Sequence, residues 1–238
     1  MRADQLLVER GLAASRSQAQ RLIAAGLRWR LGAGAWRSVA KNGDEIPEVA
    51  ELQLADAAES RYVSRGGLKL EGALQRTGQP VAGLRCLDVG QSTGGFTDCL
   101  LQQGAAQVIG VDVGHGQLNA RLRADPRVLC VEKLNARELD AQALLAAGGE
   151  PAAPPFDLIV GDLSFISQTL VWPALQPLLA PQGHLLMLVK PQFELQPEQI
   201  GKGGLVRDPA SYALVEARMR QACAELGWRV LDYFASPI

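Results

Sequence analysis

This chain lacks the features of membrane, secreted and metal-binding proteins. No apolar run approaches the ~18 residues that a transmembrane helix needs, and the N-terminus carries no charged, apolar, small-residue leader. Its four cysteines lie far apart, with no CxxC pair and no histidine nearby; they are Cys86, Cys99, Cys130 and Cys223. This spacing favours core thiols in a reducing cytosol and indicates no metal site. We therefore expect a soluble, cytoplasmic protein.

The chain also has almost no net charge, so nucleic-acid binding would require a local basic patch. The formal net charge of the 238 residues is −1, which excludes attraction by bulk charge. Positive charge is in local excess between Arg10 and Lys41, because this segment contains no Asp or Glu. The basic residues of this segment are Arg10, Arg16, Arg21, Arg28, Arg30, Arg37 and Lys41. The alternative is an ordinary solvated surface, but such surfaces normally carry both acidic and basic side chains. The pattern favours RNA.

Residues 1–58 are predicted to form a small first domain of two helices and a short sheet. A first helix ends at Gly11, and Ser15 followed by Gln18 is typical of the N-terminus of a second helix, which ends at Gly26. The stretch "LRWRL" then alternates strictly, which indicates a half-buried strand with a basic outer face. The turn "KNGD" and the later "LQL" indicate two more short strands. We interpret "ADAAES" at 55–60 as the linker to a second domain, 59–238.

The second domain reads as a doubly wound α/β fold with a mostly parallel sheet. Helical patterns alternate with apolar runs that are typical of strands buried on both faces. The runs are "LRCLDVG", "AQVIGVDVG", "RVLCVEKLN", "FDLIVGDLS", "GHLLMLVKP" and "GWRVLDYF". Pro173 and Pro177 are expected at helix starts or kinks. Residues 191–209 lack periodicity, and a loop of that length is usually functional or disordered.

The turn "LDVGQSTGGFTDCL" after the first of these strands has its glycines at 90, 94 and 95. This spacing is neither the dinucleotide G-x-G-x-x-G nor a Walker loop, so it disfavours a pyrophosphate cradle. Asp88 precedes the turn and could bind an amino group, while Asp112 ends the next strand, where an acid binds both hydroxyls of a ribose. An amino acid joined to a ribose suggests S-adenosylmethionine. The alternative is that the glycines only make a tight strand-to-helix turn.

Three further polar residues are expected at the same edge of the sheet. Asp162 and Lys190 end two strands, and Lys69 lies just before the first strand. A lysine alone is usually a solvated surface charge, but strand ends at the ligand edge favour a functional role. A Lys-Asp-Lys cluster suits removal of a proton from an alcohol, because crowding lowers the pKa of a lysine so that it can act as a base. The carboxylate would orient it.

Several of these motifs together resemble a known family. The segments "YVSRGGLKLEGAL", "LDVGQSTGGFTDCLLQQGA", "VDVGHGQL", "DLSFIS", "KPQFE" and "SPI" are similar to the TlyA family of ribosomal RNA 2'-O-methyltransferases, also called hemolysins, which have an FtsJ-like catalytic domain. The segment "LLVERGLAASRSQAQRLIAAG" resembles the alpha-L RNA-binding motif of ribosomal protein S-four. The resemblance covers nearly the whole chain and implies a Rossmann-like, class I methyltransferase domain.

The resemblance also implies a substrate, a cofactor and a set of site residues. Lys69, Asp162 and Lys190 would be the first three members of a Lys-Asp-Lys-Glu catalytic tetrad. The cofactor would be S-adenosylmethionine, bound by Asp88, Gly90, Ser92, Thr93, Gly94, Gly95, Phe96, Asp112, Asn135 and Asp162. The target would be the ribose of cytidine in small- and large-subunit rRNA, with rRNA or ribosomal subunits as partners. The expected RNA contacts are Arg16, Arg21, Arg28 and Arg30, with Lys202 and Arg207 in the long loop.

The chain departs from the family pattern at its end. The family continues past "SPI" into a Gly-Asn-x-Glu stretch with the fourth tetrad residue, and no residue here matches that glutamate. Glu194 belongs to another motif and is not assigned to the tetrad. The final strand is expected to be absent, which leaves "WRVLDYF" without its neighbour.

Two other functions are therefore considered beside the enzyme. A non-catalytic RNA-binding or ribosome-assembly factor on the same fold would agree with the absent glutamate. A membrane-lytic protein would agree with the hemolysin name, but the sequence offers no spanning segment and no lysine-rich helix with a large apolar face.

Overall fold

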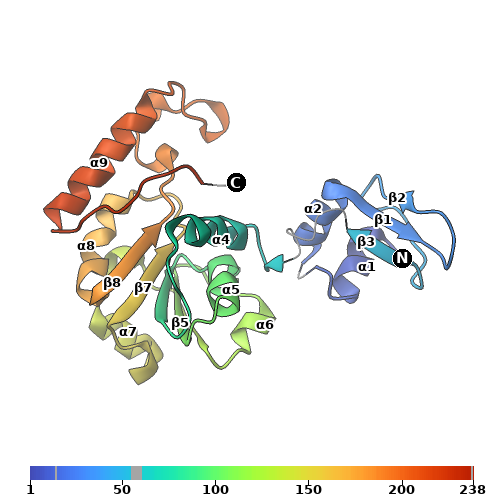
Figure 1. Cartoon of the computed structure of the whole chain (residues 1–238), viewed down its shortest axis with the longest axis horizontal. Helices are drawn as coiled ribbons and strands as arrows, with labels where there is room; N and C mark the ends of the chain where they lie inside the picture. The colour runs from blue at the N-terminus through green and yellow to red at the C-terminus, as the bar shows by residue number, and fades with distance from the viewer. Residues whose placement is uncertain (14, 55–60, 237) are drawn as a thin grey trace. The chain divides into compact units, whose positions relative to one another are not determined.

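The computed structural model describes residues 1–13, 15–54, 61–236 and 238. Its contacts divide the chain into two compact units, Met1–Leu68 and Lys69–Ile238 (Figure 1). The expected linker at 55–60 lies outside the described residues, and so does the expected domain boundary after residue 58.

The first unit has the two helices and the small sheet that the sequence predicted. Helices α1 (Ala3–Glu9) and α2 (Arg16–Gly26) pack on an antiparallel sheet of order β2-β1-β3. Its strands are β1 (Leu27–Arg30), β2 (Arg37–Ser38) and β3 (Glu51–Leu54). The Ser15 side chain accepts a hydrogen bond from the Gln18 backbone N–H at 3.3 Å and so caps α2. Leu7, Leu22 and Leu27 are fully buried in this unit's core.

The second unit confirms the doubly wound fold. Its five strands are all parallel and lie in the order β6-β5-β4-β7-β8. Their bounds are Arg85–Val89 for β4, Gln107–Asp112 for β5, Val128–Glu132 for β6, Phe156–Gly161 for β7 and Leu179–Met187 for β8. The order reverses beside β4, so β4 and β7 border the crevice where such sheets bind ligands.

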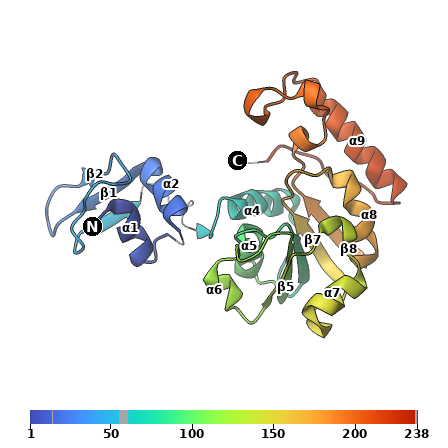
Figure 2. The same ribbon diagram turned by 180° about the vertical axis from the view of Figure 1, so that it is seen from behind.

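Helices cover both faces of this sheet (Figures 1 and 2). They are α4 (Gly66–Thr77), α5 (Gly95–Gln102), α6 (Ala120–Arg123), α7 (Ala141–Gly148), α8 (Trp172–Leu175) and α9 (Ser211–Glu225). Leu144 of α7, Trp172 of α8 and Met219 of α9 pack in one core with the strands. Pro173 and Pro177 begin α8 and the 3-10 turn Gln176–Leu178, as predicted.

Short 3-10 turns make up much of what lies between these elements. They are Ala136–Glu138, Glu150–Ala152, Gln168–Leu170, Pro191–Phe193, Pro197–Gln199 and Lys202–Gly204. The last three lie in the long aperiodic loop. Of the four cysteines expected to be core thiols, Cys86 and Cys99 are buried, whereas Cys130 and Cys223 are only half-buried. Burial raises the pKa of the Cys86 thiol to about 12.

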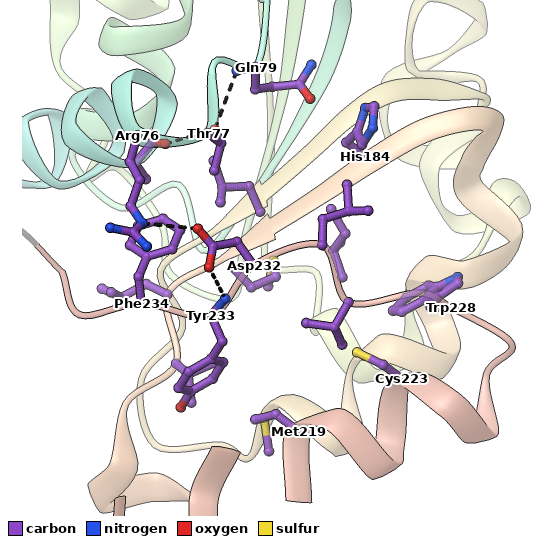
Figure 3. Close-up of a pocket in the computed structure, with 18 of the residues that line it drawn as sticks. Arg76, Thr77, Gln79, His184, Met219, Cys223, Trp228, Asp232, Tyr233 and Phe234 are labelled. Atoms are coloured by element: carbon purple, nitrogen blue, oxygen red, sulfur yellow. Dashed lines mark hydrogen bonds and ion pairs between the residues drawn. The ribbon is translucent and has the colours of Figure 1, made fainter. Parts of the chain in front are cut away.

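The prediction of a strand at "GWRVLDYF" is wrong. Within the part of the chain that is described, Trp228–Ser236 pairs with no strand. An extended segment becomes a strand only when a neighbouring backbone satisfies its N–H and C=O groups. Here a groove of about 1390 Å³ lies between this segment, β8, α4 and α9 (Figure 3). The segment is instead held by side chains, because Arg76 Nε donates to Asp232 Oδ2 at 3.0 Å and the Arg76 guanidinium covers the Phe234 ring at 4.7 Å.

Candidate active site

The glycine turn closes tightly against the end of β7. Gly90 and Gly94 have φ angles of +85° and +95°, which an L side chain rarely adopts. A Cβ at Gly90 would lie 3.1 Å from Leu163 Cδ2 and 3.2 Å from the Asp162 carbonyl oxygen. A Cβ at Gly94 would lie 2.4 Å from Leu122 Cδ1. The backbone conformation therefore favours glycine at both positions, and the neighbouring atoms leave little room for a side chain.

Asp88 lies beneath this turn and is 1% exposed. The Thr97 hydroxyl donates to Asp88 Oδ2 at 2.7 Å and accepts from Gln91 Nε2 at 2.9 Å. Burial raises the pKa of Asp88 to about 7, and the Thr97 hydrogen bond opposes that shift. Asp88 Oδ1 is buried and has no hydrogen-bond partner among the described residues. A buried carboxylate oxygen left open in this way suits an approaching cationic group.

Asp112 is held rigidly at the end of β5. Its Oδ2 accepts from the Ser92 N–H and its Oδ1 from the Gly114 N–H, both at 2.7 Å. The carboxylate is half-buried and still has lone pairs for two hydroxyl donors. On the neighbouring strand, Glu132 accepts from Arg123 at 2.6 Å and lies 2.7 Å from His115 Nδ1. The Arg123 hydrogen bond is the main cause that lowers the pKa of Glu132 to about 2.

The other residues expected at the cofactor occupy different surroundings. Thr93 is exposed, and its carbonyl accepts from the Asn119 N–H at 3.2 Å. Gly95 and Phe96 are buried at the start of α5. Asn135 is exposed, and its Oδ1 accepts from the Arg137 N–H at 3.1 Å.

The three expected catalytic side chains lie together. Asp162 follows β7, Lys190 follows β8, and Lys69 lies in the first half of α4. Lys190 Nζ is 2.6 Å from Asp162 Oδ1, and Lys69 Nζ is 3.2 Å from Asp162 Oδ2. All three side chains are between 20% and 27% exposed. The carboxylate thus joins two amines that face a partly open site, one on each of its oxygens.

Sequence reasoning missed two residues beside this cluster. Lys190 Nζ donates to Ser164 Oγ at 2.7 Å. Phe165 has φ +64°, is 91% exposed, and contacts Phe193 with ring centroids 5.2 Å apart and ring planes tilted by 49°. A left-handed backbone at a non-glycine residue costs on the order of 1–3 kcal/mol and is concentrated at functional sites. The signal was present in "DLSFIS", where an aromatic residue interrupts a polar strand-end loop.

The carboxylates of this crevice fit the polar groups of S-adenosylmethionine. The open oxygen of Asp88 suits its amino group, and the fixed carboxylate of Asp112 suits its ribose. Among the described residues, no group of three or more His, Cys, Asp and Glu side chains could hold a metal ion.

The expected RNA contacts are spread over both units. In the first unit Arg28 is exposed on β1, and Arg21 is half-buried on α2. Arg16 and Arg30 both pair with acids of the same unit, Arg16 with buried Asp4 at 3.4 Å and Arg30 with Glu51 at 2.6 Å, but their side chains remain 57% and 34% exposed. In the second unit Lys202 and Arg207 are exposed in the long loop. No helix within the described ranges is long and apolar enough to cross a membrane.

Two family profiles match the chain. The family described as FtsJ-like methyltransferase matches residues 62–238, and the S4 domain matches residues 1–27.

Known proteins of similar sequence and structure match over the full chain. The 16S/23S rRNA (cytidine-2'-O)-methyltransferase TlyA of Mycobacterium tuberculosis is 44% identical over 100% of this chain and 84% of that protein. Hemolysin A of Brachyspira hyodysenteriae is 35% identical over 100% of this chain and 94% of that protein. A solved structure from Streptococcus thermophilus, provisionally described as a hemolysin, superposes with a TM-score of 0.73 at 39% identity and covers 100% of this chain and 82% of that one.

Proposed function

Because the chain belongs to the TlyA family of FtsJ-like methyltransferases, we propose that it methylates the 2'-hydroxyl of cytidine ribose in 16S and 23S rRNA. The single observation that carries the proposal is the contact of Lys69 and Lys190 with the two oxygens of Asp162 at the end of β7. The strand order supports the proposal, because β7, which precedes Asp162, is the neighbour of β4, which carries Asp88, and β4 is the neighbour of β5, which ends at Asp112.

The residues of the chain divide the work of binding and proton transfer. When bound, S-adenosylmethionine supplies an electrophilic methyl group on a sulfonium sulfur. Asp88 and Asp112 hold its two polar ends. In its neutral form, Lys190 Nζ accepts the proton of the ribose hydroxyl, because a hydroxyl is a weak nucleophile until a base removes its proton. Asp162 fixes the positions of both lysines, and the positive charge of Lys69 offsets the negative charge of Asp162.

Phe165 is proposed to receive the base of the target nucleotide. RNA-modifying proteins commonly hold unstacked bases on aromatic side chains. Phe165 is exposed, and its ring contacts the tilted ring of Phe193. It lies one residue after Ser164, which hydrogen-bonds Lys190. The proposed aromatic platform, Phe165, therefore lies next to the residue that contacts the proposed general base, Lys190.

The first unit is proposed to provide sequence-independent affinity for structured RNA. The S4 match and the acid-free segment from Arg10 to Lys41 support this role. Arg28 is the exposed arginine of β1, which makes it the main candidate for a phosphate contact.

The test measures donor binding and methyl transfer separately. S-adenosylmethionine is titrated by calorimetry, and labelled methyl incorporation is followed with ribosomal subunits from a strain that lacks the modification. We expect Lys190→Ala to abolish incorporation while donor binding and RNA binding persist. Arg220→Ala, which removes an exposed basic side chain of α9 whose partner is Glu216, serves as the control. RNA binding without methyl incorporation by the unmodified protein would instead identify an RNA-binding factor.

A further inference from the structure

A buried carboxylate outside the Lys-Asp-Lys cluster joins the two loops that carry it. Glu194 is 4% exposed and lies four residues after Lys190 in the loop that follows β8. Its Oε2 accepts from Ser167 Oγ at 2.6 Å, and its Oε1 accepts from the Gln168 backbone N–H at 2.7 Å. Both donors belong to the loop that follows β7 and carries Asp162. The two oxygens of one carboxylate therefore bridge neighbouring strand-end loops.

Other buried groups reinforce this bridge. Gln168 is 2% exposed, and its Nε2 donates to the Leu188 carbonyl at 3.1 Å, directly after β8. The Trp172 indole donates to Gln168 Oε1 at 3.2 Å. Arg218 of α9 donates to the Glu194 carbonyl at 2.6 Å. A satisfied buried network of this kind fixes one arrangement, because losing one member leaves the others unpaired.

The bridge runs beside the contacts that matter for chemistry. Lys190 Nζ reaches Asp162 at 2.6 Å and Ser164 at 2.7 Å across the same two loops. These contacts and the Glu194 hydrogen bonds both span the space between the loops after β7 and β8. Proton transfer requires a heavy-atom distance held to within a fraction of an ångström. A change in the loop spacing would therefore alter the lysine position without removing any reacting group.

We propose that Glu194 is a positioning residue for methyl transfer, which sets the distance between Lys190 and Asp162 by holding Ser167 and Gln168. The catalytic consequence of this inference rests on the proposed function. The claim that Glu194 holds the two loops together does not. Glu194 is not assigned to the reacting atoms, since its two oxygens are taken by the hydroxyl and amide that they hold.

The kinetic test compares three variants at Glu194 and its surroundings. Glu194→Ala should lower kcat by about 10- to 100-fold with little change in donor affinity, as expected for a misplaced base. Glu194→Gln should recover much of kcat, because its carbonyl still accepts from Gln168 and its amide can donate to the Ser167 hydroxyl. Glu198→Ala, on an exposed side chain of the same loop, should behave as the unmodified protein.

A second control separates positioning from loss of stability. Leu144→Ala on α7 removes a fully buried side chain of the same unit. If it lowers Tm as much as Glu194→Ala and lowers kcat equally, the role of Glu194 is only structural and the proposal fails. An unchanged kcat in folded Glu194→Ala also overturns it.

Amide hydrogen exchange tests whether Glu194 holds the two loops together, and it does not depend on an activity measurement. Glu194→Ala should accelerate exchange in both 163–170 and 190–195, while Glu198→Ala should leave both unchanged. Faster exchange in neither loop, or in one alone, overturns the proposal. An unmodified protein that transfers no methyl group would instead contradict the proposed function, and the exchange result would still decide whether Glu194 couples the loops.

Discussion

The Thr97 hydroxyl donates to Asp88 at 2.7 Å beneath the glycine turn, and this contact stabilises an otherwise unfavourable buried carboxylate. Asp88 is 1% exposed, so its charge is costly in the free protein. Binding of a cationic group would relieve that cost. This cost is the physical reason for our proposal that the turn binds the cationic amino group of the donor.

The raised pKa of Asp88 makes stability depend on pH. Its folded pKa of about 7 lies above the usual value of 3.8, so folding favours the protonated form. The contribution of this group to stability is greatest below about pH 4 and is lost as pH rises towards 7. We expect Tm to fall from pH 5 to pH 8 by more in the unmodified protein than in Asp88→Asn. Thermal unfolding across this range measures the difference, and parallel curves for the two proteins would contradict it.

Donor affinity should show the opposite dependence on pH. The amino group of S-adenosylmethionine prefers ionised Asp88, so its affinity should rise between pH 6 and pH 8 with release of a proton. Calorimetry in two buffers of different ionisation enthalpy detects that proton. Asp88→Asn should bind more weakly and lose the pH dependence. A retained slope in this variant would assign the proton to another group.

Asp112→Ala should weaken donor binding by removing hydrogen bonds to the ribose. Hydrogen bonds to a charged group contribute roughly 1.5–3 kcal/mol, which corresponds to an increase of about 10- to 150-fold in Kd. Asp125→Asn is the matched control, because Asp125 precedes β6 at the opposite end of the sheet and pairs with Arg127. Equal Kd values for the two variants would remove Asp112 from the cofactor site.

Phe165→Ala should lower methyl transfer to RNA without changing donor affinity. Stacking of a nucleobase on an aromatic ring contributes about 1–3 kcal/mol, so kcat/KM should fall about 5- to 150-fold. Phe165→Trp should restore it. Phe165→Gly should raise Tm, because glycine adopts φ +64° without strain. Full activity in Phe165→Ala would place the base elsewhere.

Arg28→Ala should weaken RNA binding uniformly across sequences. A lost phosphate contact reduces the slope of log K against log salt by about 1. Arg10→Ala is the control, since the Arg10 guanidinium donates to the Ala50 carbonyl at 2.6 Å and also to the Glu48 carbonyl. A similar slope change in both variants would show a general charge effect.

The apolar runs of the sequence predicted the positions of the strand-end acids and lysine better than they predicted the contacts around them. Asp112, Asp162 and Lys190 could be placed at strand ends because a parallel sheet brings its carboxyl ends to one edge. The ion pairs of Arg16 with Asp4 and of Arg30 with Glu51 could not be predicted. Each partner is distant in sequence and carries no periodic signal. An arginine that pairs with an acid therefore cannot be recognised from the sequence alone.

The sequence by itself determined the parallel sheet, the glycine turn and the order of the acids and lysines along the strand ends. These follow from local patterns, in which side-chain period, turn chemistry and strand length agree. Only the tertiary structure decided that "GWRVLDYF" stays unpaired, that Phe165 turns outward, and that Glu194 joins two loops. Each of these depends on partners that are distant in sequence, and hydrogen-bond pairing and burial are properties of neighbours in space.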